Sequence, residues 1–145
     1  MKTKLIAVFA ALLALAPSVW AAPAGVTLTM KIVPVIVLPV GQKDVTVPVT
    51  LTLATDKAVT LQSSNPCEIH IWNVTDANGG DVENHSFCTM EFEPQVNPLA
   101  AGERRTSNEF ISLHAADYRE GETYTLHYRF WGVSAETKFA VKQVK

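Results

Sequence analysis

Hydrophobic and polar residues alternate along much of the chain, most clearly in segments 26–32 (VTLTMKI) and 45–54 (VTVPVTLTLA). An alternation with a period of two residues is typical of strands that bury one face. The residues predicted to face a core in these two segments are Val26, Leu28, Met30, Ile32, Val45, Val47, Val49, Leu51 and Leu53. Pro34, Pro39 and Pro48 cannot donate a hydrogen bond to a neighbouring strand, so they predict edges, bends or bulges.

Further short segments with strand character follow, and sequences rich in Gly, Asn and Asp separate them. They read AVTLQSS, CEIHIWNVT, VENHSFCTM, RRTSNEFISL, TYTLHYRFW and TKFAVKQV, and HAADYREGE has room for one helical turn. Seven or eight short strands within about 120 residues predict an all-β fold, an antiparallel β-sandwich of the immunoglobulin type. Neither an internal repeat nor a low-complexity linker interrupts residues 25–145, which we expect to form a single domain.

The N-terminal segment has the features of a secretory signal peptide. Lys2 and Lys4 precede an apolar run at 5–15, and small residues follow it. The run is too short to cross a membrane, and no later segment approaches the ~20 apolar residues that a spanning helix needs. We expect residues 1–21 to be removed, with cleavage after Ala21 or as late as Ala24. The mature protein should then be soluble, without a membrane span, and periplasmic or secreted.

Charge bears on the kind of partner. Two of the 12 basic residues, Lys2 and Lys4, fall in the predicted signal peptide, so 10 basic and 14 acidic residues remain. Nucleic-acid binding requires a basic face that neutralises phosphates. The acidic balance therefore argues against a nucleic-acid partner.

The chain contains two cysteines, Cys67 and Cys88, and each has a histidine three residues away, His70 and His85. In an exported protein two cysteines favour a disulfide. The alternative is a Cys2His2 metal site, structural or regulatory. On a strand, residues three apart point to opposite faces, whereas a tetrahedral site needs all four ligands on one side. Parity thus favours the disulfide over the metal, and we expect no cofactor.

Counting along the hairpin that turns at 77–79 gives a register for this pair. Gly79 takes the left-handed position of the loop, and Val74 then faces Val82. Because the alternation breaks between Ile71 and Trp72, we expect a one-residue bulge there. With that bulge the two cysteines are directly opposed across the strands, within disulfide range, and so are the two histidines.

The segment TYTLHYRFW provides a candidate contact surface. Its inward residues are Tyr124, Leu126, Tyr128 and Phe130, and its outward residues are Thr125, His127, Arg129 and Trp131. Tryptophan and arginine are enriched at binding hot spots, so an exposed stripe of His127, Arg129 and Trp131 would suit a protein partner. The alternative is a Trp131 covered by a neighbouring loop, with Arg129 stacked on it. Tyr124 lies where a sandwich often places a tyrosine corner.

Several short motifs resemble the BsuPI-type intracellular proteinase inhibitor family. Residues 53–82 (LATDKAVTLQSSNPCEIHIWNVTDANGGDV) resemble its opening, PLAAGE resembles its L-x-P-G-E turn with Ala101 in place of proline, and EGETYTL resembles its closing motif. The resemblance implies an immunoglobulin-like domain that inhibits a proteinase. This chain departs from the family in being exported and in carrying two cysteines.

A second, weaker resemblance is to the chagasin-type cysteine-proteinase inhibitors. SSNPCEIHIW is similar to their N-P-T-T-G-Y-x-W loop, and HYRFW to their Y-x-R-P-W strand. Cys67 and Glu68 replace the threonine pair, and Phe130 replaces a proline. Both resemblances imply binding through loops at one end of the sandwich, near Ser64, Asn65 and Pro66 and near NPLAAGE, which would occlude a substrate cleft without being cut.

The sequence contains none of four common catalytic or cofactor-binding motifs: the G-x-S-x-G elbow, H-E-x-x-H, the phosphate loop and C-x-x-C. We therefore expect a protein-binding domain rather than an enzyme, with a proteinase among the candidate partners. Two alternatives stay open. One is a non-inhibitory accessory or adhesion-type domain that binds an envelope protein or glycan, and the other is a periplasmic metal-binding protein.

Overall fold

The computed structural model describes residues 23–86, 88 and 93–144, and strands dominate them. The predicted signal peptide and residues 87 and 89–92 of the predicted return strand lie outside the described residues. The strands are β1 (Val26–Ile32), β2 (Val35–Pro39), β3 (Asp44–Thr55), β4 (Val59–Ser63), β5 (His70–Thr75), β6 (Asp81–Ser86), β7 (Gln95–Leu99), β8 (Arg104–His114), β9 (Thr123–Phe130) and β10 (Val133–Val144). Two 3₁₀ turns, η1 (Pro66–Glu68) and η2 (Ala115–Asp117), complete the elements, and η2 confirms the helical turn predicted after β8. No helix in this part of the chain is long and apolar enough to cross a membrane.

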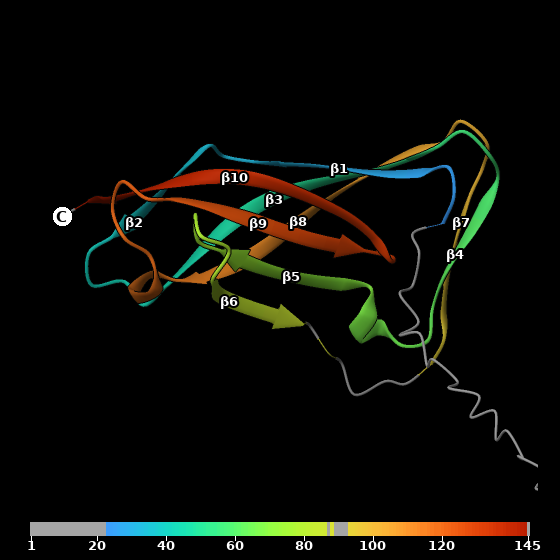
Figure 1. Ribbon diagram of the computed structural model, residues 1–145. Helices are drawn as coiled ribbons and strands as arrows, with labels where there is room; N and C mark the ends of the chain where they lie inside the picture. Colours follow the sequence, from blue (N-terminus) through green and yellow to red (C-terminus); the bar gives the residue numbers. More distant parts are fainter. Residues whose placement is uncertain (1–22, 87, 89–92, 145) are drawn as a thin grey trace, which may run out of the picture.

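The strands form two facing layers and a short ribbon at one end (Figure 1). One layer has the order β1-β3-β8, the other β2-β10-β9-β5-β6, and β4 pairs with β7 in the ribbon. The all-β, sandwich-like prediction is confirmed. Two details differ from it: the described residues hold ten strands rather than seven or eight, and the β2–β10 pair is parallel. The two additional strands are β2, which follows a switch of layers at Pro34, and β7, whose last three residues fall in the predicted turn NPLAAGE.

The core follows the predicted alternation. All four inward residues of β9, Tyr124, Leu126, Tyr128 and Phe130, are buried. In β3, the inward residues from Val47 to Leu53 are buried as well, and Leu51 is fully enclosed. Burying one such leucine side chain stabilises the fold by about 1.5–3 kcal/mol. The core therefore rests on residues whose positions the local pattern already specifies.

The three prolines lie where a missing N–H does little harm. Pro34 lies between β1 and β2, and Pro39 is the last residue of β2. Pro48 is inside β3, one residue beyond the last β1–β3 pair, Ile32 with Val49. The prediction is confirmed for Pro34 and Pro39, which mark a bend and a strand end, whereas Pro48 lies within the central strand of its sheet, opposite Phe110 of β8.

The β5–β6 hairpin turns as predicted but has a different register. The amide of Asp76 donates to the carbonyl of Gly80, and Gly79 has φ +82°, so the three-residue loop is confirmed. The register shift, however, lies between Val74 and Thr75, not between Ile71 and Trp72. Trp72 is therefore paired with His85 and Val74 with Glu83, so the predicted pairings of His70 with His85 and of Val74 with Val82 are wrong.

Two tyrosines tie the start of β9 to the rest of the fold. The hydroxyl of Tyr124 accepts the backbone N–H of Arg119 at 2.8 Å and donates to Glu122 Oε2 at 3.1 Å, a bond to the upstream backbone like that of a tyrosine corner. The hydroxyl of Tyr118 donates to Glu83 Oε2 at 2.7 Å. Burial raises the pKa of Tyr118 far above its usual value, and the adjacent Glu83 carboxylate adds to that rise. The phenol therefore stays a donor across the physiological range.

Candidate functional site

The loop after β4 is built by its own side chains. The hydroxyl of Ser63 donates to the carbonyl of Asn65 at 2.6 Å, and the hydroxyl of Ser64 donates to Glu68 Oε2 at 2.8 Å. Pro66 begins η1. Its fixed φ suits this position, and the first N–H of a helical turn has no partner within the turn, so its absence removes no hydrogen bond. The predicted binding residues Ser64, Asn65 and Pro66 thus lie on a short loop with several internal bonds.

Cys67 and Cys88 are joined by a disulfide, with their Cα atoms 4.1 Å apart. This confirms the predicted pairing, although not as a cross-strand pair. Cys67 belongs to η1 and Cys88 follows β6, so neither cysteine lies on a paired strand position. The bridge joins the loop after β4 to the segment that leaves the β5–β6 hairpin.

The β9–β10 hairpin reaches the same loop from the other side. Its turn residues Trp131 and Gly132 both have positive φ, +52° and +78°, as a two-residue type I′ turn requires. The backbone N–H of Trp131 donates to the carbonyl of Ile69 at 3.0 Å. The structure therefore brings together two groups that the sequence presented as separate candidates, the loop and the C-terminal end of β9.

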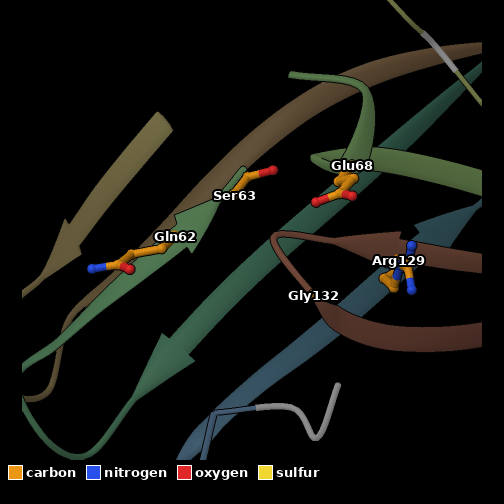
Figure 2. A pocket seen from close by; sticks show the side chains of 5 residues that line it. All are labelled: Gln62, Ser63, Glu68, Arg129 and Gly132. Atoms are coloured by element: carbon orange, nitrogen blue, oxygen red, sulfur yellow. The ribbon is translucent and has the colours of Figure 1, made fainter. Parts of the chain in front are cut away.

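A small depression lies between these segments (Figure 2). It measures about 80 Å³ and is lined by Gln62, Ser63, Glu68, Arg129 and Gly132. Glu68 and Arg129 carry opposite charges on its lining. Neither Gln62 nor Glu68 stood out in the sequence, because only the tertiary approach of the hairpin turn to η1 gives them this position. We refer to Ser64, Asn65, Pro66, Glu68, Arg129 and Trp131 as the end surface.

Asn65 has an unsatisfied atom in this region. Its Nδ2 donates to the hydroxyl of Ser64 at 3.3 Å, while its Oδ1 is buried and has no hydrogen-bond partner among the described residues. A buried acceptor without a partner is uncommon and costs free energy. The loop therefore holds a carbonyl oxygen that can still accept a hydrogen bond.

The predicted stripe of His127, Arg129 and Trp131 is not continuous. His127 lies on the outer face of β9, with Nε2 3.0 Å from the hydroxyl of Thr75 and Nδ1 3.3 Å from Glu136 Oε2. Arg129 is exposed on the same face, but Trp131 is in the turn, where it is partly buried against the core. The left-handed turn ends the alternation, so Trp131 belongs with the loop rather than with His127.

The second predicted loop, NPLAAGE, lies at the other end of the β4–β7 ribbon. Val59 pairs with Leu99 beside this turn, whereas Ser63 pairs with Gln95 beside the end surface. Four residue steps along a strand separate them by about 13 Å. In the turn itself, Ala100 N–H donates to Glu103 Oε2 at 2.7 Å; this bond, together with Arg105, lowers the pKa of Glu103.

The four residues weighed as metal ligands have other partners. The two cysteine sulfurs bond to each other, His85 stacks on Trp72 at 5.3 Å between ring centres, and Nδ1 of His70 lies 3.2 Å from the hydroxyl of Tyr128. Within residues 23–86, 88 and 93–144, no group of three or more His, Cys, Asp or Glu side chains could hold a metal ion.

Comparisons with known proteins do not identify a family for this chain. No family model and no curated protein sequence matches the chain. Among solved structures it is similar to part of a beta-glucosidase from Listeria innocua. The mutant enzyme in complex with laminaribiose gives a TM-score of 0.44 at 12% identity over 87% of this chain, and the enzyme in complex with glucose gives 0.44 at 13% over 83%. The chain spans only 17% and 16% of those two enzymes.

Proposed function

We propose that this chain is an exported, disulfide-stapled domain of the immunoglobulin-like class that binds a protein partner through the end surface, and that the partner is a proteinase whose cleft it occludes. The resemblance to the BsuPI-type and chagasin-type inhibitors supports this choice of partner. A disulfide further supports a location outside the cytoplasm, periplasmic or secreted, because such bridges persist in oxidising compartments.

One observation carries the proposal: the loop of the end surface is fixed on both sides. The disulfide holds Cys67 in η1. The hydrogen bond from Trp131 to the carbonyl of Ile69 ties the end of the loop to the turn of the β9–β10 hairpin. A loop ordered before binding loses less conformational entropy on association. The same surface presents Trp131 and Arg129, residue types enriched at binding hot spots. A rigid loop of this kind suits a steric inhibitor that enters a cleft without being cut.

The test is a titration of the purified protein against a panel of serine and cysteine proteinases. We expect at least one of them to be slowed at micromolar concentration, and the inhibitor to keep its intact mass after long incubation. Cleavage within residues 63–69 during inhibition would show a substrate-like mechanism instead. If no proteinase in the panel is slowed, the proposed inhibition is wrong.

A groove on the outer face of β5, β9 and β10 favours a second candidate, a non-inhibitory accessory domain that binds an envelope protein or glycan. The groove measures about 540 Å³, and Asn73, His127, Arg129 and Glu136 are among its lining residues. In a pull-down from envelope extract, His127→Ala should remove a partner that wild-type protein retains. Glu120→Gln, which alters an exposed side chain outside this groove, is the control. An unchanged set of partners for His127→Ala would rule out this candidate.

A further inference from the structure

A second cleft lies between the open edges of the two main sheets, and none of the end-surface residues lines it. β8 is the outer strand of one sheet and β6 the outer strand of the other, so neither edge is paired within the described residues. The cleft has a volume of about 420 Å³, within the range of small-ligand pockets. Its lining residues are His70, Trp72, His85, Glu109, Phe110, Ser112 and Tyr128.

Rings dominate this lining. Five of the seven residues carry an aromatic or imidazole ring, and they come from β5, β6, β8 and β9. Trp72 is buried and stacks on His85, whereas Phe110 is 70% exposed at the edge of β8. The faces of Trp, Tyr and Phe rings attract cations through their quadrupoles. Phe110 alternates with the inward Glu109 along β8, so its exposed ring stands at the outer rim of the cleft.

Glu109 supplies the one carboxylate among these seven residues. It lies at an inward position of β8, in phase with the buried Ile111 and Leu113, and its carboxylate accepts a hydrogen bond from the hydroxyl of Ser107. No ion pair of the described residues includes Glu109. A half-buried carboxylate that faces rings, without a cationic side chain beside it, favours a cation from outside the chain.

The neighbouring groups do not neutralise this charge. Burial lowers the pKa of His70, although the Glu109 carboxylate opposes that effect, so the imidazole is neutral above pH 7. Burial also raises the pKa of Tyr128, and the negative charge of Glu109 raises it further. The negative charge of Glu109 thus affects the pKa of both His70 and Tyr128, but neither side chain acts as its counter-ion.

We infer that this cleft binds an organic cation, an alkylammonium group that lies against the rings and pairs with Glu109. This site is independent of the proposed proteinase inhibition. The cation has two chemical sources, a free small molecule such as a quaternary amine or the side chain of a lysine in another protein. Both present the same group to the cleft, and the experiment separates them.

The experiment follows the indole N–H resonance of Trp72 in ¹⁵N-labelled full-length protein at pH 8. Choline is the first probe, and 3,3-dimethyl-1-butanol, which has the same shape without the charge, is its control. We expect saturable shifts with choline and binding about tenfold weaker or worse with the neutral alcohol. A tripeptide Gly-Lys-Gly that binds more tightly than choline identifies a protein side chain as the ligand, and the reverse order identifies a free quaternary amine.

The variants test the two walls of the site separately. Glu109→Gln keeps the size of the side chain and removes the charge, so affinity for the cation should fall about tenfold or more. Phe110→Ala changes an exposed residue, leaves the core intact and should weaken binding about threefold or more. Glu120→Gln removes an exposed charge elsewhere and should bind like wild type. If neither choline nor the tripeptide gives a saturable shift, or if Glu109→Gln binds as wild type does, the inference is wrong and Glu109 serves only to protect the β8 edge from pairing.

Discussion

Removal of the disulfide is the perturbation whose size the structure sets most directly. The bridge joins residues separated by 21 positions. In the chain-entropy model, closing a loop of that length restricts the unfolded state by about 3 kcal/mol at 25 °C. For a domain of this size in urea, with an m-value of about 2 kcal/mol/M, the unfolding midpoint should therefore fall by about 1.5 M.

The assay is urea unfolding followed by circular dichroism on three samples: oxidised wild type, wild type in a phosphine reductant, and the double variant Cys67→Ala/Cys88→Ala. The reduced and double-variant samples open the same loop, so their midpoints should agree and both should lie below that of the oxidised protein. Intact-mass analysis with a thiol reagent should find no free thiol in the oxidised sample. Equal midpoints for all three samples would refute the reasoning, because they would show that other contacts already restrict the loop.

Three further predictions concern buried titratable groups. Burial lowers the pKa of His70 below 6.5, so the unfolding free energy should keep its full value above pH 6.5 and decline as the pH falls below it. His70→Gln should make that decline shallower in urea titrations, and an unchanged pH dependence would contradict the prediction. Burial raises the pKa of Tyr118 and Tyr128 above 10.0, so stability should hold up to pH 10 and fall above it, with tyrosinate absorbance from these two residues appearing only on unfolding. Tyr118→Phe removes the bond to Glu83 and should lower the unfolding free energy by about 1.5–3 kcal/mol; a midpoint equal to that of wild type would argue against it.

The strands were predictable because their signal is local. In β9, the strict alternation of Tyr124, Leu126, Tyr128 and Phe130 with polar residues is enough to define the buried face, and the structure follows it. The turn at Gly79 was predictable for the same reason, since only a few residue types favour its positive φ. Where neighbouring residues alone decide the conformation, the sequence was sufficient.

The surroundings of Cys67 were less predictable, because they depend on contacts between distant segments. Parity counting treated residues 67–69 as strand, but Pro66 begins a 3₁₀ turn and β5 starts only at His70. The approach of Trp131 to Ile69 depends on the pairing of β5 with β9, two strands that are distant in the sequence, and no local pattern encodes it. The pairing of the cysteines was nevertheless correct, since two cysteines leave one intramolecular choice.

The edge cleft shows a signal that the sequence did contain. Glu109 interrupts the inward series of β8, two residues before the buried Ile111. A charged residue in phase with core positions indicates either a ligand site or protection of a strand edge. Only the structure shows that β8 is an edge strand and that His70, Trp72 and Tyr128 face the same cleft.

The central claim, inhibition through the end surface, is tested most directly by one pair of inhibition constants. Arg129 lies near the end of β9 within the end surface, whereas Arg119 lies in the turn before β9, whose first residue is six steps or about 20 Å from Arg129. Both arginines are exposed, so charge reversal at either leaves the core unchanged. Against the most strongly inhibited proteinase of the panel, Arg129→Glu should raise the inhibition constant about tenfold or more, and Arg119→Glu should leave it unchanged. Equal inhibition constants for wild type and Arg129→Glu would contradict the account.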